Sequence, residues 1–213
     1  MALPSFIARW LAGRRHRRQA PDRVVLGLGN PGEEYADTRH NVGFRVVERL
    51  AGRHGATWRA DAGLEARIAS FGLDGLDCLL VEPLTFMNRS GRTAAAIAER
   101  WPTLDFARDL LVVFDDLDLP TGRIRLRAEG GAGGQRGMSD ILDTLGTRAI
   151  PRLRFGIGRP GVRGAAVVDW VLSPFTAAEQ EGVDHAVERA ADALEMALAD
   201  GVAAARGRFN AGP

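Results

Sequence analysis

An imidazole and two carboxamides fall close together in the N-terminal part of the chain. Asn30, His40 and Asn41 lie in the run GLGNPGEEYADTRHNVGF, which spans residues 27–44. The apolar residues before this run predict a buried strand that ends in a glycine turn, and the apolar spacing after it predicts a helix over about 41–54. Asn30 would then follow a strand and His40 would open a helix, so both can face one pocket. An imidazole placed there is a candidate general base for activating water, and the alternative is a purely structural histidine.

Two later segments contain the partners that such a base needs. The run PLTFMNRSG, residues 83–91, contains Asn88, whose amide can hold a water molecule or a carbonyl oxygen. Asp115 follows an apolar strand predicted over 110–114 and can accept the second ring N–H of the histidine, which would set its tautomer. The residues predicted to carry the chemistry are therefore His40, Asp115, Asn30 and Asn88.

Other chemistries are less favoured by the same segments. The acids at 115, 116 and 118 resemble a metal site in composition, but carboxylates alternate in direction along a strand and only one histidine is placed near them. We therefore expect no metal and no cofactor. No GxSxG elbow occurs, and the lone Cys78 lies within a predicted strand, so no covalent nucleophile is expected.

A nucleotide-dependent oxidoreductase is a second alternative, because GLGNPG formally matches the GxGxxG pattern. In a dinucleotide site the glycine turn enters its helix directly and places the pyrophosphate at the helix N-terminus. Here Glu33 and Glu34 extend the loop and put negative charge where a pyrophosphate would approach. The pattern therefore does not predict a nucleotide site.

Four segments of the chain together resemble the bacterial-type peptidyl-tRNA hydrolase family. They are GLGNPGEEYADTRHNVGF, PLTFMNRSG, FDDLDLPTG and GGAGGQRG, and the similarity runs from about residue 24 to the C-terminus. The resemblance implies hydrolysis of the ester between a peptide and the terminal ribose of tRNA, which recycles tRNA from peptidyl-tRNA released during translation. The family's base, orienting acid and two substrate-holding amides fall, in that order, on His40, Asp115, Asn30 and Asn88. The residues that fall along its peptide groove are Tyr35, Phe86 and Met87.

The second glycine loop departs from the family pattern. Where the family usually reads Gly-Gly-His-Asn-Gly, residues 133–137 read Gly-Gly-Gln-Arg-Gly. Arg136 cannot accept a hydrogen bond and so cannot replace an amide in full, whereas Gln135 could stand in from one position earlier. We expect both residues to contact substrate. Because losing one positioned polar group can cost about 10²- to 10³-fold in rate, a weakened or inactive RNA-binding relative is the main alternative function.

A row of arginines precedes this loop. Arg123, Arg125 and Arg127 alternate along a predicted strand at 123–127, so they share one face. Such a row is either a solvated face or a clamp for tRNA phosphates, and its position beside the glycine loop favours the clamp. The resemblance implies a contact between the tRNA 5′ phosphate and Arg127.

The pattern of elements predicts an α/β fold: a single domain with a mixed, mostly parallel, twisted sheet flanked by helices. A hairpin over 64–71 and 76–81 turns at Asp74-Gly75, and one long helix is expected over 177–205. The remaining elements are expected as helices at 88–100, up to 145 and at 165–172, and as a strand at 152–157. We expect the domain to span 23–213 and residues 1–22 to form a basic extension.

The bulk properties limit the setting in which the protein works. Residues 1–23 hold six arginines and one aspartate, so the rest of the chain, with 22 arginines and 26 acidic residues, has a net charge of −4. Any nucleic-acid contact must therefore be local. No apolar run could cross a membrane, and the single cysteine fits a reducing compartment, so a cytoplasmic monomer is expected. A transit peptide, a membrane or RNA contact, and plain disorder all stay open for residues 1–23.

Overall fold

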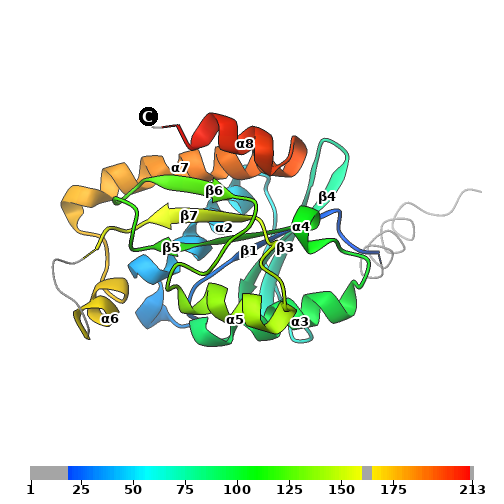
Figure 1. The fold of residues 1–213 in the computed structure, drawn as a ribbon, viewed down its shortest axis with the longest axis horizontal. Coiled ribbons are helices and arrows are strands. Elements are labelled where there is room, and N and C mark those ends of the chain that lie inside the picture. The colour runs from blue at the N-terminus through cyan, green and yellow to red at the C-terminus, as the bar shows by residue number, and fades with distance from the viewer. Residues whose placement is uncertain (1–18, 160–164, 212–213) are drawn as a thin grey trace, which may run out of the picture.

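The computed structural model describes residues 19–159 and 165–211. Within these ranges the chain is one α/β unit built on a seven-stranded sheet with the order β2-β3-β4-β1-β5-β7-β6 (Figure 1). The predicted fold class is confirmed. The predicted extension, residues 1–22, lies almost entirely outside the described residues.

The central strands are parallel and the outer ones are antiparallel. The strands are β1 (Arg23–Gly27), β2 (Arg59–Asp61), β3 (Ala66–Leu73), β4 (Leu76–Pro83), β5 (Leu110–Asp116), β6 (Ile124–Arg127) and β7 (Arg152–Gly156). Strands β4, β1, β5 and β7 run parallel, while β3, β2 and β6 pair antiparallel with their neighbours. Because the parallel strands all end at one edge, the loops after them converge there, which is where open α/β sheets bind ligands.

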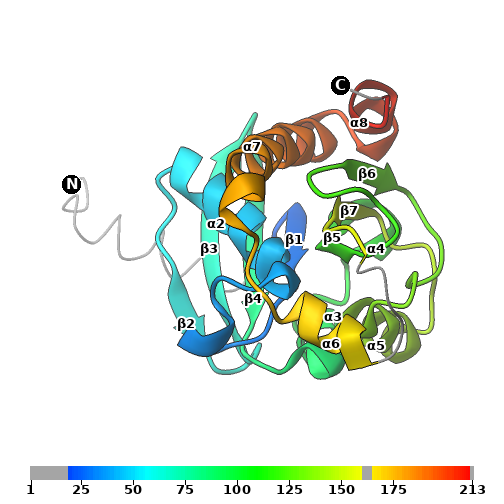
Figure 2. The same ribbon diagram turned by 90° about the vertical axis from the view of Figure 1, so that its left-hand side faces the viewer.

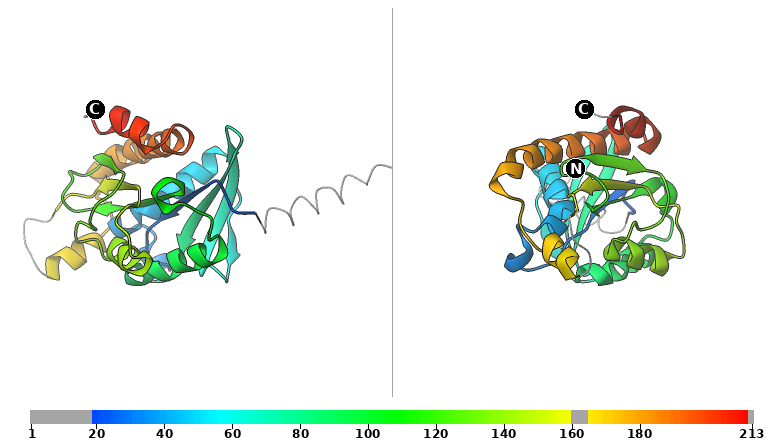
Figure 3. Two further views of the ribbon diagram at one scale, coloured as in Figure 1. Left: turned by 45° about the vertical axis from the view of Figure 1, so that its right-hand side comes forward. Right: turned by 60° about the vertical axis from the view of Figure 1, so that its left-hand side comes forward.

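Helices cover both faces of the sheet. The helices and short 3₁₀ turns are η1 (Glu33–Tyr35), η2 (Arg39–Asn41), α2 (Val42–Arg53), η3 (Met87–Arg89), α3 (Ser90–Arg100), α4 (Phe106–Asp109), α5 (Arg136–Leu145), α6 (Ala165–Val171), α7 (Ala177–Ala199) and α8 (Val202–Phe209). Figure 3 shows α7 and α8, in orange and red, on the opposite side of the sheet from the green helices α3 and α5. In Figure 2 the carboxyl edge of the parallel strands faces the viewer, and α6 lies in front of it.

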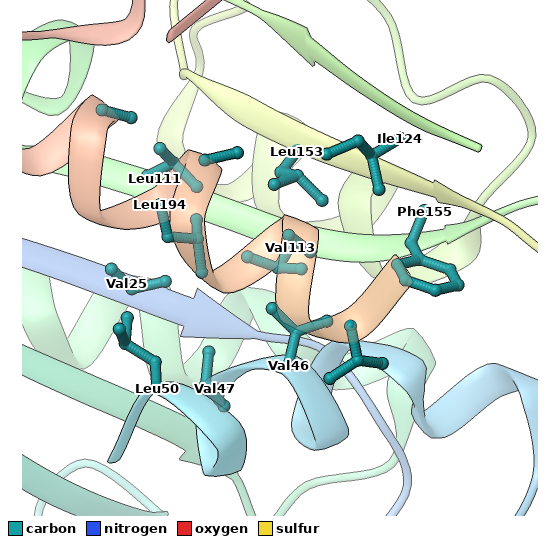
Figure 4. Packing of buried hydrophobic residues seen from close by; sticks show 14 of the residues in the cluster. Val25, Val46, Val47, Leu50, Leu111, Val113, Ile124, Leu153, Phe155 and Leu194 are labelled. Atoms are coloured by element: carbon teal, nitrogen blue, oxygen red, sulfur yellow. The ribbon is translucent and has the colours of Figure 1, made fainter. Parts of the chain in front are cut away.

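Two buried apolar clusters hold the layers together. One lies between the sheet and α2, α7 and α8, and the other lies on the face covered by α3 and α5. Figure 4 shows the first cluster, in which side chains of α2 and α7 pack on those of the parallel strands. The labelled residues are Val25, Val46, Val47, Leu50, Leu111, Val113, Ile124, Leu153, Phe155 and Leu194. The predicted stripe of α2 is therefore the face that this helix buries.

The β3–β4 hairpin turns where the sequence predicts. Leu73 pairs with Leu76, so the loop has two residues, and both Asp74 (φ 50°) and Gly75 (φ 84°) have positive φ. A two-residue loop with positive φ at both positions matches the right-handed twist of the strands, and Asp-Gly favours it.

Glycines allow α2 to approach the sheet more closely than any side chain would permit. A Cβ on Gly43, in the first turn of α2, would lie 2.4 Å from the carbonyl oxygen of Leu28 and 2.6 Å from that of Val113. A Cβ on Gly27 would lie 2.6 Å from the carbonyl oxygen of Gly43. The first glycine of GLGNPG therefore serves helix–strand packing. The helix itself begins only at Val42, so the loop does not have the form of a dinucleotide turn.

Three expectations about elements were inaccurate. The long helix predicted over 177–205 is interrupted, because Gly201 adopts φ 89° and separates α7 from α8. The helix predicted from residue 41 starts at Val42, after the 3₁₀ turn η2. The short elements β2 and α4 were not predicted, since three or four residues are too few for a periodic pattern.

The packing of Gly43 predicts a large difference between two glycines of α2. Gly43→Ala should destabilise the protein by about 1–3 kcal/mol, because the added methyl group meets backbone atoms that cannot move aside. Gly52→Ala is the matched control, since its Cβ would meet nothing within 4 Å, and it should be neutral or stabilising by up to about 1 kcal/mol. Urea unfolding of both variants measures the difference. Equal effects of the two substitutions would contradict this account.

Candidate active site

His40 and Asp115 meet at the carboxyl edge of the sheet. Asp115 is next to last in β5 and its side chain is 3% exposed, whereas the His40 side chain, in η2, is 13% exposed. The imidazole Nδ1 lies 2.9 Å from Oδ1 of Asp115. This is the distance of a hydrogen bond, yet the buried Nδ1 has no partner in hydrogen-bonding geometry, so the two groups touch without being aligned. Catalytic hydrogen bonds are often poorly aligned until substrate binds.

The contact determines which nitrogen of His40 is available. Nδ1 is buried against the carboxylate, and the residue lines an open cavity. Asp115 therefore favours the tautomer with the proton on Nδ1, and Nε2 is the nitrogen left to accept a proton from a molecule in the cavity. The sequence prediction that Asp115 is the partner of His40 agrees with this placement.

Asn30 and Asn41 frame the loop before His40. Asn41 accepts from the backbone N–H of Asn30 at 2.8 Å and donates to its carbonyl at 2.9 Å. The side chain of Asn30 accepts from the backbone N–H of Met87 at 2.7 Å. Because that N–H requires an oxygen, the amide orientation of Asn30 is settled, and its Nδ2 has no partner among the described residues. A donor is therefore available at the cavity wall.

The cavity beside these groups has a volume of about 400 Å³ and a polar end and an apolar end. The polar residues that line it are Asn30, His40, Asn88, Asp115, Gln135 and Arg136. Asn88 is exposed in η3, and its amide has no hydrogen-bond partner within the described ranges. All four predicted catalytic residues thus lie around one cavity.

An apolar wall faces the polar groups. It includes Phe86, which is 53% exposed, and the edge of its ring lies against Tyr35, with centroids 6.4 Å apart. Met87 also lines the cavity but is only 4% exposed, so it forms part of the floor. The rest of the wall was not singled out from the sequence and comprises Leu117, Val167, Val168, Val171 and Leu172. The signal was present, because the valines of α6 repeat at helical spacing and Val168 and Leu172 are exposed.

The altered glycine loop delivers two side chains with different surroundings. Arg136 is exposed and lines the cavity. Gln135 is 7% exposed, and both ends of its amide are bonded within the protein: Oε1 accepts from the Met138 N–H at 2.6 Å, and Nε2 donates to Asp115 at 3.1 Å. A direct substrate contact of Gln135 stays a prediction.

The arginine row lies along the outer strand β6. Exposed and buried residues alternate along this strand, as the sequence predicts: Arg125 and Arg127 are exposed, while Ile124 and Leu126 are buried. Arg123 precedes the strand and donates to the carbonyl of Asn210 at 2.8 Å, so part of its guanidinium is used within the protein. Arg127 also borders a surface depression whose other cationic residues are Arg148 and Arg206.

A buried arginine fixes the turn that carries His40. Arg39 is 1% exposed and donates to both carboxylate oxygens of Glu179, at 3.0 and 2.7 Å. Its guanidinium lies 3.9 Å from the ring centroid of Trp170, in α6, and 4.7 Å from that of Phe175. One side chain therefore joins η2, the apolar wall and α7, a role that the sequence did not reveal.

The remaining candidate groups are engaged elsewhere. Asp116 points away from Asp115 and accepts from Arg154 and from the Asp118 N–H, the latter at 2.8 Å. Among residues 19–159 and 165–211, no group of three His, Cys, Asp or Glu side chains could hold a metal ion. Burial raises the pKa of the Cys78 thiol to about 11, so this cysteine stays protonated. In the same residues, no helix is both long and apolar enough to cross a membrane.

The α/β fold carries, at the carboxyl edge of its sheet, a cavity whose side chains are those that a hydrolase with general-base chemistry would need. An imidazole held by a buried carboxylate can take a proton from water, and amide donors at the same cavity can bind a carbonyl oxygen. The apolar wall can bind the non-reacting part of a substrate.

Comparison with known proteins agrees with this class. The sequence profile of the family described as peptidyl-tRNA hydrolase matches residues 24–213. A curated relative of that name from Chloroflexus aggregans is 48% identical, over 88% of this chain and 98% of the relative. Another from Syntrophomonas wolfei is 42% identical, over 88% of this chain and 100% of the relative. The crystal structure of peptidyl-tRNA hydrolase from Acinetobacter baumannii matches with a TM-score of 0.83 at 35% identity, covering 91% of this chain and 96% of that one. The chain belongs to the peptidyl-tRNA hydrolase family and is an enzyme.

The Arg39–Glu179 pair predicts a pH dependence of stability. Hydrogen bonds from Arg39 lower the pKa of Glu179 from 4.5 to about 2. A lowered folded-state pKa stabilises the fold above pH 4.5, and this stabilisation is lost as the pH falls from 4.5 to 2. Glu179→Gln should cost about 1.5–3 kcal/mol at pH 7 and reduce the pH dependence in that window, as measured by urea unfolding.

The matched control for this variant lies on the same helix. Glu188 also pairs with arginines, but its side chain is 40% exposed, so Glu188→Gln should cost about 0–1 kcal/mol. If both variants lose the same stability, Arg39 is not the clamp described here.

Proposed function

We propose that this enzyme hydrolyses the ester bond between a peptide, or an N-blocked amino acid, and tRNA. The observation that carries the proposal is the contact of His40 with the buried Asp115 beside a cavity that is also lined by the unbonded Nδ2 of Asn30 and the amide of Asn88. The resemblance of the four sequence segments to the peptidyl-tRNA hydrolase family, at the same residues, supports it.

The proposed reaction is a general-base attack. Nε2 of His40 takes a proton from a water molecule, and the resulting hydroxide adds to the ester carbonyl carbon. Nδ2 of Asn30 donates to the carbonyl oxygen as it gains negative charge, while Asn88 holds the attacking water. The tetrahedral intermediate then collapses. The ribose oxygen leaves with the proton returned by His40, so atoms and charge balance.

The peptide part would lie along the apolar wall. Tyr35, Phe86 and Met87 supply one side, and the exposed Val168 and Leu172, at α6, supply the other. Burial of apolar surface is non-directional, so such a wall accepts many side chains and suits peptides of varied sequence. Arg136, at the polar end, would contact the end of the substrate nearest the ester.

The tRNA backbone would lie toward β6. Arg125 and Arg127 present exposed positive charge along β6, Arg123 directly precedes this strand, and arginine binds phosphate strongly. The domain bearing these contacts would be residues 23–213. We place the enzyme in the cytoplasm as a monomer that rescues tRNA during translation and needs neither metal nor cofactor.

Replacing the proposed base tests the reaction. His40→Ala should lower kcat by at least about 10³-fold and change the affinity for tRNA little, because the imidazole acts on water. Hydrolysis of N-acetyl-aminoacyl-tRNA measures the rate. His185→Ala, an exposed histidine on α7, is the control and should retain full activity. A wild-type enzyme that binds tRNA without turnover above buffer would instead establish the inactive RNA-binding relative.

The departure from the family loop gives a second test. Arg136→Asn should raise kcat by up to about tenfold, because it places an amide acceptor at the cavity. Arg92→Asn removes the same charge from an exposed pair with Glu65 and should leave the rate unchanged. An unchanged or lower rate in Arg136→Asn would show that the loop is adapted to its present residue.

A further inference from the structure

The amide of Gln135 connects three elements that build the site. It caps α5 by accepting from the Met138 N–H at 2.6 Å, and it contacts η3 through the sulfur of Met87 at 3.0 Å. Its second N–H donates to Oδ1 of Asp115, in β5, at 3.1 Å. At 7% exposure the amide is almost sealed from solvent, so water does not compete for these bonds.

Both donors that reach Asp115 approach the same oxygen. Oδ1 lies 2.9 Å from Nδ1 of His40 and 3.1 Å from Nε2 of Gln135. A hydrogen bond from a neutral amide stabilises a carboxylate and withdraws charge from the oxygen that receives it. The strength and direction of the contact between Asp115 and His40 therefore depend on the amide.

We propose that Gln135 is a positioning residue that holds Asp115 in place and weakens its hold on the protonated form of His40. The role rests on the proposed function, in which His40 is the base. It assigns Gln135 a task different from contact with substrate, because both polar ends of its side chain are already used. The chain thus builds its carboxylate–imidazole pair with a third, neutral member from the altered glycine loop.

The shape of the amide allows this role to be separated from helix capping. In Gln135→Asn the shorter side chain still provides an oxygen to cap α5, since asparagine is a favoured N-cap residue, but its N–H groups are drawn back from Asp115. This variant keeps the cap and loses the proposed contact.

The titration of His40 is the direct readout, since it needs neither substrate nor turnover. The charged or titratable groups that line the cavity are His40, Asp115 and Arg136. Without the amide donor, Asp115 stabilises the imidazolium more strongly, so the midpoint of the His40 NMR signal should rise by about half a pH unit in Gln135→Asn.

Kinetics gives the second readout. In Gln135→Asn the acid limb of the kcat profile should move by the same amount, and the plateau should fall about tenfold while KM changes less than twofold. Asp140→Ala is the control: it removes the 2.6 Å bond from the Gly91 N–H that ties α5 to α3 and touches neither Asp115 nor His40. It should lower the melting temperature and leave the His40 midpoint unchanged.

Each outcome decides between the possibilities. If Gln135→Asn shows the wild-type midpoint, as Asp140→Ala should, the amide is only a helix cap and the proposal is wrong. If the midpoint moves but wild-type turnover does not depend on His40, Gln135 still tunes the pair and the proposed function fails instead. A selective rise in KM, with the midpoint unchanged, would assign Gln135 to substrate contact.

Discussion

No side chain fits between the first turn of α2 and the ends of β1 and β5. Gly43 lies where a Cβ would overlap the carbonyl oxygens of Leu28 and Val113, and Gly27 leaves space for the helix backbone. This close approach brings η2, and His40 with it, against the end of β5. Had the helix been held away by even one methyl group, the imidazole could not lie 2.9 Å from Asp115. Gly27, the first glycine of GLGNPG, is thus a packing requirement, and this part of the resemblance to a dinucleotide loop follows from the shared need for close backbone contact.

The carboxamides in and beside the cavity fall into two groups: those bonded within the protein at both oxygen and nitrogen, and those with a polar atom left to bind a ligand. Asn41 and Gln135 have oxygen and nitrogen bonded within the protein, so they define where the loops lie. Asn30 is bonded at its oxygen by Met87, and Asn88 is exposed in η3. The Nδ2 of Asn30 faces the cavity and is free to donate to a molecule there. Asn30 is therefore best explained by a carbonyl oxygen, or water, that occupies the polar end of the cavity.

Local pattern was enough to predict every strand except β2, the Asp74-Gly75 turn and the buried stripe of α2, because each depends on neighbours in sequence. It also predicted His40 with Asp115, although only the order of motifs and the chemistry of a base suggested their contact. The interruption at Gly201 was missed, because a single glycine in an alanine-rich run weakens a helix but does not necessarily end it. The bond from Arg39 to Glu179 spans 140 residues and leaves no periodic signal. The bonds of the Gln135 amide likewise leave no local signal in the sequence. The residue type suggested a contact with substrate, whereas the structure shows both ends of the amide bonded within the protein.

The Arg39 clamp gives a physical reason why peptide binding and chemistry should be coupled. Arg39 precedes the base directly, and its guanidinium lies over Trp170, within the helix whose valines form the apolar wall. A substrate that pushes on α6 therefore pushes on the residue next to His40 through a side chain with 1% exposure and little freedom to adjust. The pair of His40 and Asp115 is in contact but not aligned. Contacts made away from the reacting bond can in general be used to align catalytic groups, and Arg39 is the side chain that joins the apolar wall to the turn that carries the proposed base.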